Sequence, residues 1–136
     1  MQQEAKECPA PLILMVEDQA TIRRMTSRML SSMGYCILEA SNGQEGLDLF
    51  RSRQEDIALV ILDLTMPVMD GRDVFYRIRE IKPSVKVIFM SGYPRPDLVD
   101  ELLGEGIAGF LQKPFPIDEL SDMIRRLTEP ESCGPR

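Results

Sequence analysis

Acidic side chains directly follow two apolar runs of this chain. Glu17 and Asp18 come after Leu12–Val16, and Asp63 comes after the run that ends at Leu62. Three carboxylates placed together repel one another, so ionising all of them is costly unless a cation is supplied. With oxygen ligands and room for water, Mg²⁺ is the natural cation, and Mn²⁺ is expected to substitute in vitro. The acids therefore predict a magnesium site, provided that the fold brings them together.

Two further polar side chains are suited to binding a phosphoryl group. Ser91 and Lys113 each follow another short apolar run. A carboxylate such as Asp63 can attack phosphorus to give an acyl phosphate, helped by in-line positioning and by neutralising charge on the equatorial oxygens. Lys113 can supply positive charge, and the Ser91 hydroxyl can donate to one phosphoryl oxygen. The backbone N–H of Gly92 or Thr65 is expected to reach another oxygen.

Strand and helix patterns alternate along the chain. The predicted strands are Leu12–Val16, Tyr35–Ala40, Ile57–Leu62, Val85–Met90 and Gly109–Gln112. Short, nearly continuous apolar runs are typical of strands buried on both faces of a parallel sheet. Between strands lie stripes at helical spacing, namely Ile22, Met25, Met29 and Met33, then Val74, Ile78 and Ile81, then Leu120, Ile124 and Leu127. The methionines of the first stripe are expected to pack in the core.

This alternation predicts an α/β fold with a five-stranded parallel sheet and helices on both faces. With right-handed crossovers, it is the flavodoxin-like (βα)5 doubly wound sandwich. Ligands of such sheets bind beyond the carboxyl ends of the strands, so the polar side chains are expected to converge there. The domain is expected to span residues 12–128. Residues 1–11 are predicted to be an N-terminal tail or linker, and residues 129–136 a C-terminal tail.

Composition narrows the classes of function. The chain has 136 residues, 43% of them hydrophobic, which suits one compact domain. Its net charge of −6 argues against direct nucleic-acid binding, which needs clustered Lys and Arg. The absence of histidine excludes a Ser-His triad, an imidazole base and a His-ligated metal. No apolar run approaches the roughly 20 residues that span a bilayer, so no membrane contact by this domain is expected.

The cysteines are odd in number and widely spread. Cys8, Cys36 and Cys133 lack the spacing of paired metal ligands, so neither a disulfide framework nor a zinc site is predicted. The first eleven residues lack the basic and apolar regions of a signal peptide. A cytoplasmic location is therefore expected.

The motifs together resemble response-regulator receiver domains. The resemblance runs from about Leu12 to Leu127 and rests on Glu17-Asp18, the segment Asp63–Gly71, Ser91-Gly92 and Lys113-Pro114-Phe115. The family usually has two aspartates after the first strand, and the glutamate here puts metal affinity in question rather than function. The resemblance also implies a cis peptide bond between Lys113 and Pro114.

The resemblance implies a role for each site residue. Asp63 is expected to be the phosphoacceptor, and Asp18 to bind Mg²⁺ together with Asp63 and the main-chain carbonyl of Thr65. Glu17 is expected to act on the metal through water. Lys113 is expected to bind the phosphoryl group.

The resemblance further implies a switch and a means of tuning it. Ser91 is expected to be the switch hydroxyl and Phe110 the switch aromatic. Thr65 and Tyr93 are expected to tune dephosphorylation by controlling the attacking water. From the residues alone, Phe110 can equally be an ordinary core aromatic.

The expected phosphoryl donor is a phosphohistidine on a histidine kinase or a histidine phosphotransfer domain, in cis or in trans. The chain itself has no histidine and no Gly-rich nucleotide-binding loop. The fourth helix, fifth strand and fifth helix are the expected readout surface, and a phosphorylation-linked dimer through it is a further expectation. The sequence segments around Asp63, Ser91 and Lys113 look most like those of receivers attached to hybrid sensor histidine kinases. A stand-alone regulator is the alternative context for this domain.

Three other classes of protein share part of this pattern. A haloacid-dehalogenase-type phosphatase also uses a nucleophilic Asp, but its second Asp, two residues later, is replaced here by Thr65, which leaves no general acid. A flavodoxin should have a loop rich in Gly, Ser and Thr after the first strand, whereas Glu17 and Asp18 would repel phosphate. A pseudo-receiver serving only as an interaction module is disfavoured by the complete set of acids, Ser91 and Lys113. The expected activity is therefore confined to the chain's own phosphorylation and dephosphorylation.

Overall fold

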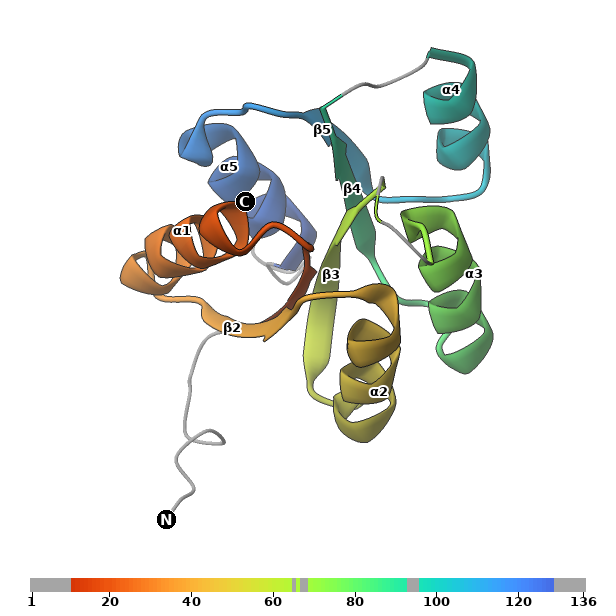
Figure 1. Cartoon of the computed structure of the whole chain (residues 1–136), viewed down its shortest axis with the longest axis horizontal. Coiled ribbons are helices and arrows are strands. Elements are labelled where there is room, and N and C mark those ends of the chain that lie inside the picture. The colour runs from red at the N-terminus through yellow and green to blue at the C-terminus, as the bar shows by residue number, and fades with distance from the viewer. Residues whose placement is uncertain (1–10, 65, 67–68, 93–95, 129–136) are drawn as a thin grey trace, which may run out of the picture.

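The computed structural model describes residues 11–64, 66, 69–92 and 96–128 (Figure 1). Within them the elements are β1 (Leu12–Val16), α1 (Ala20–Ser32), β2 (Cys36–Ala40), α2 (Gly43–Arg53), β3 (Ile57–Asp63), α3 (Gly71–Ile81), β4 (Val87–Ser91), α4 (Pro96–Gly104), β5 (Gly109–Gln112) and α5 (Ile117–Thr128). The sheet has five strands in the order β2-β1-β3-β4-β5, and every neighbouring pair is parallel. The predicted flavodoxin-like fold is confirmed. The predicted tails lie outside the described residues except for Pro11.

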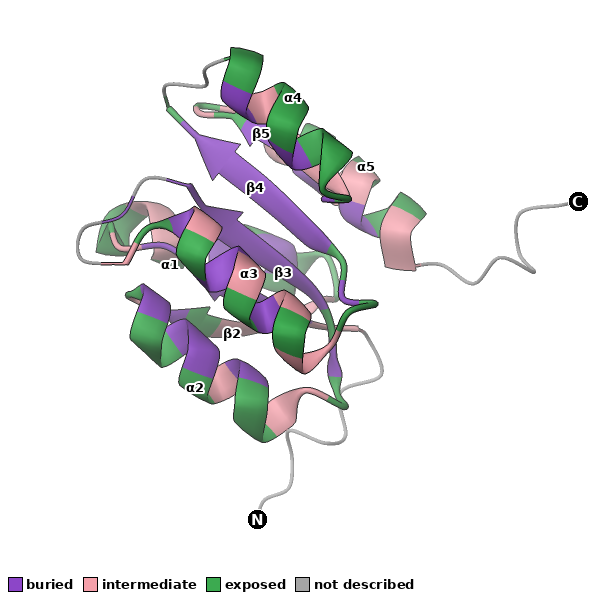
Figure 2. Cartoon of the chain, turned by 90° about the vertical axis from the view of Figure 1, so that its right-hand side faces the viewer, coloured by how far each residue is buried: buried purple, intermediate pink, exposed green. Residues whose placement is uncertain are grey.

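Each face of the sheet is covered by its own helices. Leu14, Val60 and Phe89 point to the face covered by α2, α3 and α4. Ile13 and Ile61 point to the opposite face, which α1 and α5 cover (Figure 1). Successive strand residues face opposite sides, so covering both faces buries almost the whole strand. β4 is accordingly buried along its full length (Figure 2).

Two site residues lie within strands rather than after them. β3 extends through Asp63, and β4 runs from Val87 through Ser91, later than the predicted strand. Ladder partners extend to the same points, with Asp63 opposite Met90. Both polar side chains therefore leave from backbone that is held in the sheet.

The methionine stripe, which runs along α1 to Met33 just beyond its end, is exposed to solvent, contrary to the prediction. Met25, Met29 and Met33 are 50%, 40% and 43% exposed. The buried residues of this helix include the small polar Thr26 and Ser27. The rotation of α1 is set by how closely it approaches the sheet, and small side chains permit a closer approach than methionine does.

The cysteine prediction also needs correction, because Cys36 is disulfide-bonded. Cys8 and Cys133 lie outside the described residues. A disulfide requires Cα atoms within about 7 Å, and sequence spacing does not reveal that separation. The cysteine pattern therefore no longer supports a reducing compartment. Among the described residues, no helix is long and apolar enough to cross a membrane.

The backbone at the start of α3 passes close to the end of β3. The Gly71 N–H donates to the Leu64 carbonyl oxygen at 3.0 Å. A Cβ atom at Gly71 would lie 2.4 Å from the Asp63 carbonyl oxygen and 2.8 Å from the Leu64 Cα. The close approach of these two backbone segments therefore leaves no room for a side chain at position 71.

We expect Gly71→Ala to lower the free energy of unfolding by about 2 kcal/mol or more, because the added methyl group meets backbone atoms that cannot rotate away. Urea denaturation followed by circular dichroism measures the change. Gly104→Ala is the matched control, since a Cβ at that exposed helical position meets nothing within 4 Å. Its effect should stay within about 1 kcal/mol, and an equal loss in both variants would contradict the explanation.

Candidate functional site

Three acidic side chains meet at the carboxyl edge of the sheet. β1 and β3 are neighbouring parallel strands, so Glu17, Asp18 and Asp63 emerge side by side. One carboxylate oxygen of each lies within 4.8 Å of the others. Glu17 is 0% exposed and Asp63 is 3% exposed, whereas Asp18 is partly exposed. The predicted convergence of these residues is therefore confirmed.

Lys113 supplies positive charge to these acids from the end of β5. Its Nζ lies 2.7 Å from Glu17 Oε1 and 3.4 Å from Asp63 Oδ2. Nearly buried charges interact more strongly than exposed ones, because little water screens them. The lysine therefore bridges two of the three carboxylates.

Backbone hydrogen bonds fix the strand ends that carry the site. The Glu17 N–H donates to the Ala40 carbonyl at 3.0 Å, and the Leu64 N–H donates to the Met90 carbonyl at 2.8 Å. The Lys113 N–H donates to the Ser91 carbonyl at 2.8 Å. Each side chain thus starts from backbone that a neighbouring segment holds, which suits a site that needs fixed geometry.

The segment after β5, which carries Lys113, contains the expected cis peptide bond. The peptide bond between Lys113 and Pro114 is cis, as the resemblance implied.

Ser91 is fully buried at the end of β4. Thr65 and Tyr93, two other predicted site residues, lie outside the described residues.

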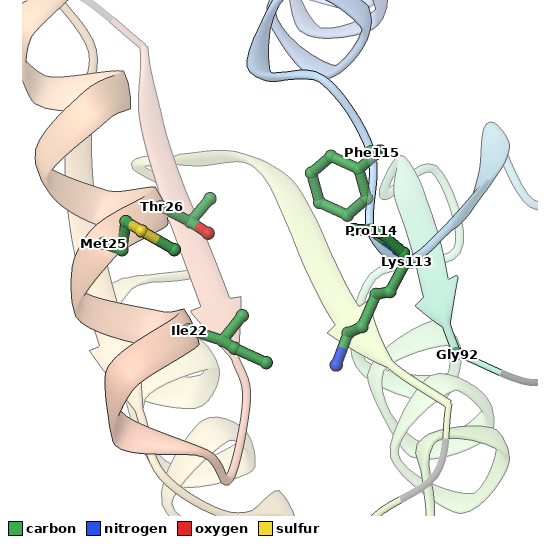
Figure 3. A pocket seen from close by; sticks show the side chains of 7 residues that line it. All are labelled: Ile22, Met25, Thr26, Gly92, Lys113, Pro114 and Phe115. Carbon is green, nitrogen blue, oxygen red and sulfur yellow. The ribbon is translucent and has the colours of Figure 1, made fainter.

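An open, mainly apolar pocket of about 490 Å³ adjoins the lysine. Figure 3 shows Ile22, Met25 and Thr26 on α1 facing Lys113 and Phe115 of the loop before α5. The amine end of the lysine extends toward the lower part of this pocket (Figure 3). The exposed methionine stripe thus begins beside the site.

Phe110 is a residue of β5, three positions before Lys113. It is partly buried and lines a second pocket together with Pro96, Val99, Asp100 and Gln112. It also packs against the core on the face covered by α2, α3 and α4. Phe110 therefore lies on the face of the sheet that α4 covers, and its switching role stays a prediction.

The donor atoms at the acidic edge fit Mg²⁺. Hard divalent cations prefer carboxylate oxygens, and Mg²⁺ keeps several waters in an octahedral shell. Oxygens in that shell are about 3.0 to 4.2 Å apart, so three carboxylate oxygens that lie within 4.8 Å of one another need only small side-chain movements to share one ion. Glu17, Asp18 and Asp63 can therefore hold the ion directly or through bridging water.

The match to known families agrees with this geometry. Residues 13–125 match the response regulator receiver domain. The chain belongs to this family. Receiver domains are signalling modules of two-component phosphorelays rather than enzymes that turn over external substrates.

Relatives of this receiver occur in proteins of very different length. It is 34% identical over 114 residues to sporulation initiation phosphotransferase F of Bacillus subtilis. The aligned region covers 84% of this chain and 90% of that protein. It is 33% identical over 117 residues to the sensor kinase CckA of Brucella abortus, covering 86% of this chain but 12% of CckA. The receiver thus spans most of one relative and a small part of the other.

A solved structure resembles the receiver in both sequence and shape. The response regulator TrrA of Thermotoga maritima, determined in complex with Mg(2+)-BeF, is 33% identical with a TM-score of 0.77. The alignment covers 86% of this chain and 98% of that one. The acidic edge of the receiver is consistent with a magnesium site of this kind.

One residue in contact with the acidic edge was missed by sequence reasoning. The Arg23 Nη1 donates to the Glu17 carbonyl oxygen at 2.9 Å. Arg23 lies in the first turns of α1, between Ile22 and Arg24, and belongs to no motif. No sequence signal distinguishes it from the adjacent Arg24, because only packing turns one arginine inward.

Mg²⁺ at about 100 times its Kd should raise the free energy of unfolding by about 2.7 kcal/mol, because it binds only the folded chain. Asp18→Asn should abolish this gain. In chelator the same variant should be at least as stable as wild type, since removing one of three neighbouring negative charges relieves repulsion on the order of 1 kcal/mol. Thermal unfolding with Mg²⁺ or chelator measures both effects. Exposed Glu55→Gln should respond like wild type, and a full Mg²⁺ response in Asp18→Asn would count against this site.

Proposed function

We propose that this receiver takes a phosphoryl group from a phosphohistidine onto Asp63. One observation carries the proposal: Asp63 ends a buried central strand while its carboxylate lies within 4.8 Å of two other acids and 3.4 Å from Lys113. A carboxylate fixed in this way is positioned for attack, and cations around it can offset the charge of an incoming phosphoryl group.

The transfer replaces one bond to phosphorus by another. An Asp63 carboxylate oxygen bonds to phosphorus as the P–N bond of the donor's phosphohistidine breaks, and the departing imidazole takes a proton from solvent. Asp63 becomes an acyl phosphate. The chain needs no nucleotide of its own, because the donor carries the activated phosphoryl group.

Each neighbouring side chain then has a defined role. By the family resemblance, Asp18 and Asp63, with the Thr65 main-chain carbonyl, would hold Mg²⁺ directly, and Glu17 would act on it through water. When bound there, Mg²⁺ neutralises charge on the phosphoryl oxygens. Lys113 binds one of these oxygens by moving from its carboxylate partners, and the Ser91 hydroxyl donates to another.

The readout surface is formed by α4, β5 and α5. Phe110 of β5 lines the same pocket as Pro96 and Val99 of α4, so a shift of β5 would reshape the space beside that helix. Recruitment of Ser91 and Lys113 by the phosphoryl group biases this surface between two states. A phosphorylation-linked dimer through the same surface follows from the proposal.

The donor is a histidine kinase or a histidine phosphotransfer domain, and we propose that this receiver is attached to a hybrid sensor kinase. The similarity to CckA supports that context, and the similarity to sporulation initiation phosphotransferase F supports the stand-alone alternative. An antibody against this domain separates the two by the size of the native protein. A band near 15.4 kDa, the mass of this chain, would contradict the hybrid context.

Incubation with acetyl phosphate and Mg²⁺ should give a phosphoryl adduct in intact-mass measurements of wild type. Asp63→Asn should give none, because an amide is a poor nucleophile, and chelator should prevent the wild-type adduct. Glu55→Gln, which changes an exposed acid in the same way, should be modified like wild type. An adduct that persists in Asp63→Asn would overturn the assignment of the phosphoacceptor. Steady hydrolysis of a generic phosphoester would instead favour the phosphatase reading.

Tyr93→Ala should shorten the lifetime of the acyl phosphate. By family resemblance, residue 93 lies beside the phosphoryl group, where a bulky ring impedes the attacking water. Loss of the adduct from purified phosphorylated chain, followed by mass spectrometry, measures the lifetime. Tyr35→Ala, which removes an aromatic ring elsewhere, is the control and should leave the acyl-phosphate lifetime unchanged. An unchanged lifetime in Tyr93→Ala would contradict the shielding role.

A further inference from the structure

Arg23 connects α1 to the end of β1 and to β2. Its Nη1 donates to the Glu17 carbonyl oxygen at 2.9 Å, and its Nε lies 3.1 Å from Glu39 Oε1. The Arg23 side chain is only 12% exposed. We propose that Arg23 is a positioning residue for the magnesium site, holding the peptide that joins Glu17 to Asp18. This inference rests on the proposed function, since it presumes that the acidic edge binds Mg²⁺.

Other contacts secure the rest of Glu17. Its N–H donates to the Ala40 carbonyl, while its carboxylate accepts from the Gln19 N–H at 3.1 Å and contacts Lys113 at 2.7 Å. The carbonyl oxygen is the group that Arg23 binds. Every polar group of Glu17 thus has a partner from a different place in the chain.

The held carbonyl matters because it belongs to the same planar peptide unit as the Asp18 nitrogen. Fixing the oxygen fixes the plane from which the Asp18 backbone continues. Asp18 is partly exposed, unlike Glu17 and Asp63, so surrounding packing constrains its side chain less. Backbone orientation therefore has a larger part in aiming the Asp18 carboxylate.

The guanidinium is suited to this role by its shape. It is planar, with donors in a fixed fork, so two hydrogen bonds in different directions set its orientation. The Arg23 Nε–H donates to the carboxylate of Glu39, which lies in β2 opposite Met15 of β1. This contact orients the guanidinium so that Nη1 points to the Glu17 carbonyl oxygen at the end of β1.

Positioning and charge act on Mg²⁺ in opposite directions. A positive group beside the acids weakens cation binding by Coulomb repulsion, so removing it should tighten binding if charge dominates. The Arg23 charge is already paired with Glu39 at 3.1 Å, which reduces its field at the acids. We therefore expect positioning to dominate, and the sign of the change in affinity distinguishes the two effects.

The test is a calorimetric titration of the purified chain with Mg²⁺. Arg23→Met, which loses charge and hydrogen bonds, and Arg23→Lys, which keeps the charge but loses the fork, should both raise Kd about tenfold, as is typical for residues that orient metal ligands. Arg24→Met is the matched control, because it removes the same charge from an exposed position on the same helix. Its Kd should stay within about twofold of wild type.

Each outcome bears on the inference in one direction. Weaker binding in both Arg23 variants, with Arg24→Met near wild type, supports it. Tighter binding in Arg23→Met, or unchanged Kd in a variant whose melting temperature has fallen, overturns it, since the residue then acts through charge or fold stability alone. If Arg23→Met does not fold, Arg23→Lys decides the matter. Absence of Mg²⁺ binding by wild type would overturn the proposed function and this inference together.

Discussion

Mutual repulsion among Glu17, Asp18 and Asp63 is the constraint around which the carboxyl edge of the sheet is arranged. Their oxygens lie within 4.8 Å of one another, and two of the side chains are almost fully buried. Such a cluster is unfavourable unless positive charge is brought to it. Lys113 brings that charge from the far end of the chain, so β5 must end at the same edge of the sheet as β1 and β3, with the lysine side chain reaching back across that edge.

The parallel sheet is what makes this arrangement achievable. Adjacent parallel strands end at the same edge, and covering both faces with helices leaves that edge as the place where polar side chains reach water. Hydrogen bonds from Glu17, Leu64 and Lys113 to neighbouring segments then hold each strand end. The close approach of Gly71 to the Asp63 carbonyl belongs to the same rigid frame.

The helix α4, which forms part of the surface proposed to read out the site, has only two buried residues. α4 buries Leu98 and Leu102, and one ion pair joins it to α3, between Arg72 and Glu101 at 3.1 Å. Exposed ion pairs of this kind contribute little to stability. A helix held by few buried side chains can change position at small energetic cost, which suits the part of a receiver that must respond to a charge added elsewhere.

The sequence by itself determined the order of strands and helices, the burial of the central strands and the three acids with their lysine. Apolar runs and strand-end carboxylates are local patterns, and the parallel topology follows from general rules of chain connection. Only the tertiary structure decided the rotation of α1, which exposes Met25 and turns Arg23 toward Glu17, and the disulfide bond of Cys36. These features depend on distances between elements, and such distances result from packing many side chains at once rather than from the pattern within any one segment.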